Sequence, residues 1–186
     1  MRIVDDARHA GIDAADGSPT GRGSSAAAAV HHVLDLGLHR GAAECGALVR
    51  VEIERATGAL RIAKAYSVLE CGQALVPEVV LGQAQGGFAM GFGYTLLETL
   101  PPYESGPGNG QWNLGQYIIA RGSDLPLHEL EIEVLPPVHP AEHPKGMAEV
   151  NMIPVVPALL NAIYDATGHR FRSLPVTQAM LKGALK

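Results

Sequence analysis

Cysteine, aromatic residues and long apolar runs are all scarce in this sequence. Its two cysteines, Cys45 and Cys71, are too few for a disulfide framework, and both stand in apolar, strand-like surroundings. We therefore expect buried free thiols in a reducing compartment, which indicates the cytoplasm. No apolar run has the length that crosses a membrane, and the N-terminus lacks the hydrophobic region of a signal peptide.

Basic residues are also few. Lys and Arg number 14 against 19 Asp and Glu, a net charge of −5, and they form no stripe that would follow a phosphate backbone. Nucleic acid is therefore not an expected partner. Glycine and proline, in contrast, number 22 and 13 of 186 residues, which favours turns and close backbone contacts over a helical bundle. The length suits one domain or one large lobe with a sizeable core.

Metal-ligand patterns are not recognisable among the histidines. His31 and His32 are neighbours and project in different directions in either a helix or a strand. His139 and His143 share a loop that a proline interrupts, so their spacing makes no helical pair. We predict no metal ligand on this chain.

Alternation of apolar and charged residues predicts strands. Residues 49–54 alternate with a period of two, and a Thr57-Gly58 turn leads into a β-branched run, so residues 47–69 predict an antiparallel hairpin. Residues 129–134 alternate in the same way and predict an amphipathic strand. Residues 111–119 contain Trp112 and Tyr117 among β-branched residues and predict a further strand.

Two apolar segments have the length of buried helices, residues 77–100 and residues 157–167, the second ended by Gly168. Each glycine in the first costs helix stability by up to about 1 kcal/mol relative to alanine, which indicates that another element or a ligand touches the backbone there. Those glycines are Gly82, Gly86, Gly87, Gly91 and Gly93. The sequence therefore predicts an α+β fold of antiparallel hairpins and strands packed with two buried helices.

Glu149 is the candidate catalytic residue. It follows Gly146, Met147 and Ala148, and no further charge occurs until Asp165. A poorly solvated glutamate has a raised pKa and acts as a general base near neutral pH. Spacing alone favours a different interpretation, a helix-start carboxylate that accepts backbone N–H groups. For Gln83, spacing alone likewise favours a glutamine on a helix surface.

Four motifs occur in order along the chain: Cys71-Gly72, GQAQGGFAMGFGYTLLE from residue 82, KGMAE from residue 145 and PALLNAIYDATG from residue 157. In this order the chain resembles the xanthine dehydrogenase and aldehyde oxidase family of molybdenum hydroxylases, in the C-terminal part of the molybdopterin-binding subunit. The resemblance covers residues 22–177. It implies that residues 23–186 fold like the C-terminal lobe of the second molybdopterin-binding domain. Residues 1–22 are rich in Asp, Gly and Ala with little periodicity, which predicts an irregular lead-in at a cut edge.

By that resemblance Glu149 is the active-site glutamate. Gln83, of the Gly82-Gln83 pair, matches the side chain that hydrogen-bonds the molybdenum cofactor, and Met147 and Ala148 match the backbone that approaches it. The family usually has glycine where this chain has Ala148, and proline or threonine often stands in place of Val150.

The same resemblance implies oxidation of a purine-like N-heterocycle with oxygen from water. Aldehyde oxidation by the same chemistry, or a non-catalytic remnant or interaction module, are the alternatives. Two cysteines cannot supply iron–sulfur ligands, so iron–sulfur clusters and FAD are expected on partner subunits, together with the rest of the molybdopterin subunit. The isolated chain, with only part of the molybdopterin site, is expected to be inactive.

Overall fold

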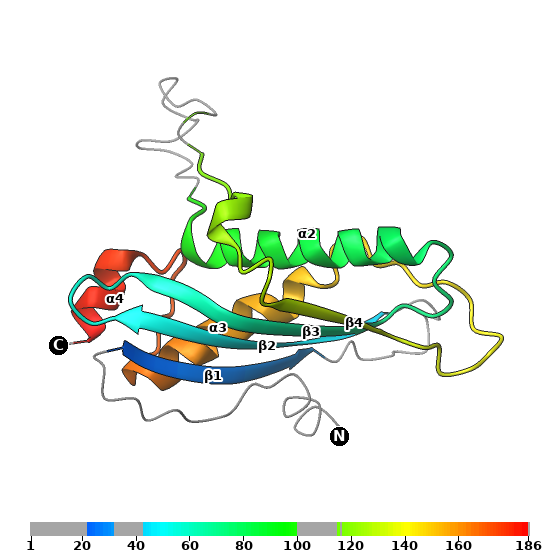
Figure 1. Cartoon of the computed structure of the whole chain (residues 1–186), viewed down its shortest axis with the longest axis horizontal. Coiled ribbons are helices and arrows are strands. Elements are labelled where there is room, and N and C mark those ends of the chain that lie inside the picture. The colour runs from blue at the N-terminus through cyan, green and yellow to red at the C-terminus, as the bar shows by residue number, and fades with distance from the viewer. Residues whose placement is uncertain (1–21, 32–42, 100–114, 116, 186) are drawn as a thin grey trace.

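The computed structural model describes residues 22–31, 43–99, 115 and 117–185. A four-stranded sheet has the order β1-β2-β3-β4 (Figure 1). The strands are β1 (Arg22–His31), β2 (Glu44–Glu54), β3 (Leu60–Glu70) and β4 (Leu130–Leu135). β1, β2 and β3 are antiparallel neighbours, whereas β4 runs parallel to β3.

The β2–β3 hairpin confirms the strand pair predicted for residues 47–69. Its register runs from Glu44 opposite Glu70 to Ile53 opposite Leu60. At the turn, Gly58 has a φ of 75° and its N–H donates to the Glu54 carbonyl at 2.7 Å. The apolar members of the alternation point into the core and are buried, because one face of the sheet is covered by helices.

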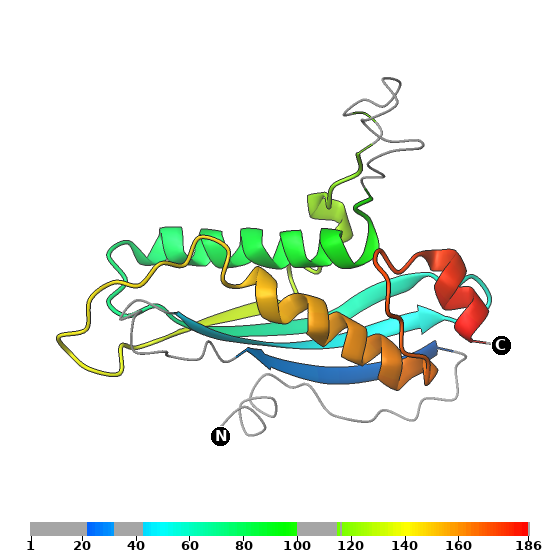
Figure 2. The same cartoon turned by 180° about the vertical axis from the view of Figure 1, so that it is seen from behind.

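Helices α2 (Pro77–Leu96) and α3 (Met152–Thr167) lie on the same face of the sheet. α3 crosses β1 and β2, and α2 lies against α3 and β4 (Figure 2). The main core forms where both helices meet the sheet, with Phe88 and Phe92 from α2, Val155 and Leu159 from α3, and Val49 from β2. The α+β fold class predicted from the sequence is therefore confirmed.

α2 begins at Pro77 as predicted, but the prediction of a buried helix is wrong for one of its faces. A stripe that includes Val80, Ala84 and Phe88 is buried, whereas Val79 is 60% and Met90 43% exposed. Apolar composition on all sides does not determine burial, because burial depends on which faces other elements cover.

α3 starts five residues earlier than predicted, at Met152, and Pro157 lies inside it. Its start is set by a turn in which the Met152 N–H donates to the Glu149 carbonyl at 3.0 Å. Its end is confirmed, because Gly168 takes the left-handed conformation, φ 70°, and its N–H donates to the Tyr164 carbonyl at 2.7 Å.

Three other predictions have different outcomes. The strand at 111–119 is wrong for described residues 115 and 117–119, because no neighbouring strand in the described part of the chain pairs with them. Cys45 and Cys71 are buried and free, as predicted. The lead-in predicted for residues 1–22 lies outside the described residues, except for Arg22, which begins β1. None of the described helices is long and apolar enough to cross a membrane.

Candidate functional site

The sequence candidates gather where residues 143–151, the Glu149 loop, run along α2 toward α3 (Figure 2). Gln83 Nε2 on α2 donates to the Ala148 carbonyl at 3.2 Å. One residue further along α2, the Ala84 carbonyl accepts Asn151 Nδ2 at 2.7 Å. Two hydrogen bonds therefore join the loop and the first half of α2 into one surface.

The loop turns some side chains inward and others outward. Met147 and Val150 pack against a second apolar cluster formed by Cys45, Leu69, Cys71, Val80 and Ala84. Gly146, Ala148 and Glu149 are exposed. Since the two inward side chains hold the loop to the core, the residues between them are presented on the outer surface.

Asn151 is the polar residue that fixes the end of the loop. It is 1% exposed, and its Oδ1 accepts the Ser67 hydroxyl of β3 while its Nδ2 donates to α2. The amide therefore connects β3, α2 and the start of α3 with its polar atoms satisfied. Beside it, Cys45 Sγ donates to the Val150 carbonyl at 3.2 Å, and burial raises the pKa of this thiol to about 11.

The two helices cross closely at two of the predicted glycines. A Cβ on Gly91 would lie 2.8 Å from Val155 Cβ, and one on Gly87 would lie 3.1 Å from the Met152 nitrogen. The predicted backbone contact is confirmed there. Gly82 and Gly86 differ, because a Cβ on either meets nothing within 4 Å. They leave an open strip of helix backbone next to Gln83.

Glu149 is exposed, so the prediction of a poorly solvated carboxylate is wrong for this chain by itself. The loop packs through Met147 and Val150, which turns Glu149 outward. The helix-start interpretation is also wrong, because the N-cap of α3 is Asn151 and the first turn bonds to the Glu149 main-chain carbonyl. In the described part of the chain, the Glu149 carboxylate accepts no hydrogen bond from α3.

Sequence reasoning missed an ion cluster at the base of the loop. Lys145 Nζ pairs with Glu70 Oε2 and, at 2.8 Å, with Glu142 Oε1. Burial alone would lower the pKa of Lys145, but hydrogen bonds to Glu142 and Glu70 outweigh this effect and raise it. The hydrogen bond from Lys145 lowers the pKa of Glu142. The one available signal was Glu70 itself, which ends β3 directly after the apolar pair Val68-Leu69.

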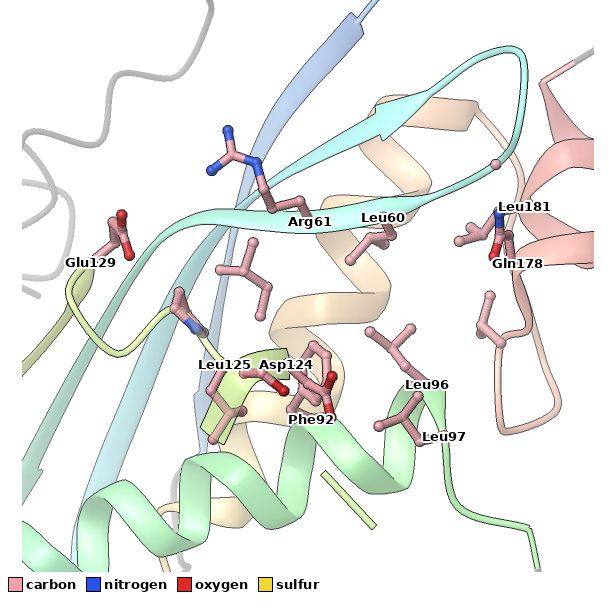
Figure 3. A pocket seen from close by; sticks show the side chains of 15 residues that line it. Leu60, Arg61, Phe92, Leu96, Leu97, Asp124, Leu125, Glu129, Gln178 and Leu181 are labelled. Atoms are coloured by element: carbon pink, nitrogen blue, oxygen red, sulfur yellow. The ribbon is translucent and has the colours of Figure 1, made fainter. Parts of the chain in front are cut away.

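A large hollow in the described part of the chain lies away from these residues. It measures about 560 Å³ and opens between the start of β3, the end of α2, the 3-10 helix η3 (Gly122–Asp124) and helix α4 (Gln178–Ala184). Phe92, Leu96 and Leu125 provide apolar walls, with Asp124 among them (Figure 3). A second hollow of about 240 Å³ borders Lys145 and the start of α2. We place the site at the loop, because the larger hollow contains none of the predicted residues.

No group of three or more His, Cys, Asp or Glu side chains in the described part of the chain is arranged to hold a metal ion. What the surface offers is exposed helix backbone, a side-chain amide and an exposed carboxylate.

The α+β lobe thus presents an open strip of α2 beside a loop with an exposed carboxylate. Comparison with known proteins shows to which family such a lobe belongs. The family described as "Molybdopterin cofactor-binding domain" matches residues 24–126, and the chain belongs to it. It resembles the molybdopterin-binding subunits of xanthine dehydrogenase and aldehyde oxidoreductase, as the sequence motifs implied.

Two curated relatives and one solved structure illustrate the likeness. A nicotinate dehydrogenase subunit from Pseudomonas putida is 32% identical over 78% of this chain and 12% of its own length. A probable xanthine dehydrogenase subunit from Bacillus subtilis is 28% identical, over 75% of this chain and 18% of its own. Quinoline 2-oxidoreductase from Pseudomonas putida 86 superposes with a TM-score of 0.66 at 31% identity, over 77% of this chain and 18% of its own. This chain thus spans less than a fifth of the length of these proteins.

Proposed function

We propose that this chain is part of a molybdenum hydroxylase that oxidises a purine-like N-heterocycle with oxygen from water. It supplies the active-site glutamate, Glu149, and one wall of the molybdopterin site. The observation that carries the proposal is the hydrogen bond from Gln83 to the Ala148 carbonyl. Two segments that are 65 residues apart, and that both match cofactor-contacting motifs, form one surface through it.

The residues of this surface fit the cofactor. Gly82 carries no side chain and a Cβ there would meet nothing within 4 Å, so the α2 backbone is open to a planar group. Gln83 offers an amide, and the exposed backbone at Ala148 lies beside it, next to Met147. Gly82, Gln83, Met147 and Ala148 would hold the cofactor. The methyl group of Ala148, in place of the usual glycine, narrows the space between the loop backbone and the cofactor, but it adds no polar group there.

When bound, the cofactor supplies the two-electron oxidation, and the protein contributes position and proton transfer. The Glu149 carboxylate accepts the proton of the attacking water-derived oxygen, and a general base of this kind contributes about 10²- to 10⁴-fold in rate. Lys145, the cation nearest along the loop, is engaged by Glu70 and Glu142 and is not available to neutralise Glu149.

The partners in this proposal are the rest of the molybdopterin subunit, an iron–sulfur subunit and an FAD subunit. An iron–sulfur cluster needs four cysteine ligands, whereas both cysteines here are buried inside the fold. We place the assembled enzyme in the cytoplasm, because both cysteines of this chain are free thiols, as is usual in a reducing compartment. The chain alone should contain no molybdenum and oxidise neither xanthine nor an aldehyde. Stoichiometric molybdenum in the purified chain would contradict this division of the site.

An N-heterocycle is the favoured substrate because nicotinate dehydrogenase and quinoline 2-oxidoreductase are named among the most similar proteins. An aldehyde is the alternative, since an aldehyde oxidoreductase from Escherichia coli has a molybdenum-binding subunit that is 29% identical over 71% of this chain. Turnover of the assembled enzyme with xanthine, nicotinate and benzaldehyde separates them. Oxidation of benzaldehyde alone would select the alternative, and loss of all three reactions would favour a non-catalytic remnant.

Glu149→Gln in the assembled enzyme tests the catalytic role. The amide has nearly the same shape and cannot accept the proton, so kcat should fall about a hundredfold or more at unchanged molybdenum content. Glu131→Gln, an exposed carboxylate on β4, is the matched control and should leave kcat unchanged. Normal turnover of Glu149→Gln would end the assignment.

A further inference from the structure

Glu70 is the buried acid at the end of the central strand β3. Among the residues that the structure describes, it is the one charged residue that is buried, at 5% exposure. Its Oε1 accepts the Gly72 N–H at 2.6 Å and its Oε2 pairs with Lys145 Nζ. A carboxylate with two donors at the end of a strand is a fixed point, because moving it would leave a buried charge without partners.

Lys145 links the Glu70 carboxylate to the Glu149 loop. Its side chain is 10% exposed, and its own N–H donates to the Cys71 carbonyl at 2.8 Å. The loop also passes so close to the strand end that a Cβ on Gly72 would overlap the His143 carbonyl. The start of the loop is therefore attached to the end of β3 through main chain and side chain together.

Asn151 attaches the other end of the loop to α2 and β3. Only residues 146–150 lie between Lys145 and this second attachment. Five residues between two fixed ends have few accessible paths, so the position of Lys145, together with the packing of Met147 and Val150, determines where the Glu149 backbone lies.

We propose that Glu70 is a positioning residue, which fixes the path of the Glu149 loop by holding the Lys145 ammonium at the end of β3. This role does not depend on a gain in stability. Buried ion pairs often contribute little net stability compared with apolar groups of the same size, so the effect to look for is the placement of the loop.

The full chain tests the placement directly. Lys145→Met alone would leave the buried Glu70 carboxylate without its cation and destabilise the fold. The main variant is therefore Glu70→Gln/Lys145→Met, which removes both charges of the pair. Lys64→Met is the control, because Lys64 pairs with exposed Glu131 on the same sheet. We expect amide hydrogen exchange of residues 143–153 to accelerate about tenfold in the double variant, with unchanged exchange in β2 and β3. Unchanged exchange of residues 143–153, or equal acceleration everywhere, would overturn the proposal.

The catalytic consequence rests on the proposed function and needs the assembled enzyme. There the double variant should lower kcat about ten- to a hundredfold, with KM and molybdenum content unchanged, because a displaced base reacts poorly. The single variant Lys145→Arg, which keeps the positive charge, should retain most of the parent's kcat. If Glu149→Gln abolishes turnover while the double variant keeps it, Glu70 does not position the base. If Glu149→Gln keeps turnover, the proposed function fails, and the exchange result is judged separately.

Discussion

Substituting Gly91 by alanine tests the helix crossing on which the site is built. The new Cβ would lie 2.8 Å from Val155 Cβ, 2.9 Å from Val155 Cγ1 and 3.1 Å from the Met152 carbonyl oxygen. Valine is branched at Cβ and does not rotate away from such a contact. The helices must therefore move apart, or α3 must slide along α2.

The matched change is Gly86→Ala, five positions earlier on the same helix. Both substitutions gain the same helix propensity, up to about 1 kcal/mol, but a Cβ on Gly86 meets nothing within 4 Å. The difference between the two variants therefore isolates the steric cost at the crossing. Overpacking of this kind costs about 1–3 kcal/mol, and we expect the upper end because both neighbours are stiff.

Thermal unfolding of the full chain measures this difference. At about 2–4 °C per kcal/mol for a chain of this size, the Tm of Gly91→Ala should lie about 6–12 °C below that of Gly86→Ala. Gly86→Ala should equal or exceed the parent. Equal Tm values for the two variants would show that α2 and α3 do not cross at Gly91 as described.

Three further outcomes are expected. Gln83→Ala should lower the molybdenum content of the assembled enzyme. It should change the Tm of the chain by no more than about 1 °C, because Gln83 is exposed. Unchanged molybdenum content would show that Gln83 is a surface residue without a role in binding the cofactor. Asn151→Leu should destabilise the chain by about 1–3 kcal/mol in urea unfolding, since Ser67 loses its amide acceptor, and a neutral result would contradict the buried network. Because burial raises the pKa of Cys45 to about 11, its neutral thiol stabilises the fold fully below about pH 9 and less as pH rises toward 11. Cys45→Ala should remove that part of the alkaline loss, and parallel stability–pH curves for parent and variant would refute it.

Local patterns predicted the parts of the fold that local chemistry determines. The β2–β3 hairpin follows from period-two alternation and the Gly58 turn, and the end of α3 follows from Gly168. The contact at Gly91 was also predictable, because glycines in a helix need a packing reason. For the hairpin and for the end of α3, the cause lies within a few residues of its effect, whereas for Gly91 only the need for a contact, not its partner Val155, follows from the local sequence.

What the sequence did not reveal depends on partners far along the chain. The parallel pairing of β4 with β3, the Glu70–Lys145 pair and the buried amide of Asn151 join residues that are 65 or more positions apart. No spacing rule connects such residues. The exposed face of α2 was mispredicted for a related reason. It carries large apolar side chains such as Val79, Leu81 and Met90, and only the absence of a covering element among the described residues leaves them exposed.

The parallel strand β4 also has a consequence for the order in which the chain acquires its structure. Ala65 pairs with Leu130, so this register closes a long loop that contains the whole of α2, and such non-local pairing is slow. The β2–β3 hairpin, in contrast, pairs residues that are close in the sequence and closes only a short turn. A nascent chain would therefore hold its three antiparallel strands before β4 docks, and the residues that follow β4, including Glu149, would be ordered last. Ribosomal synthesis in the same direction brings them out in that sequence.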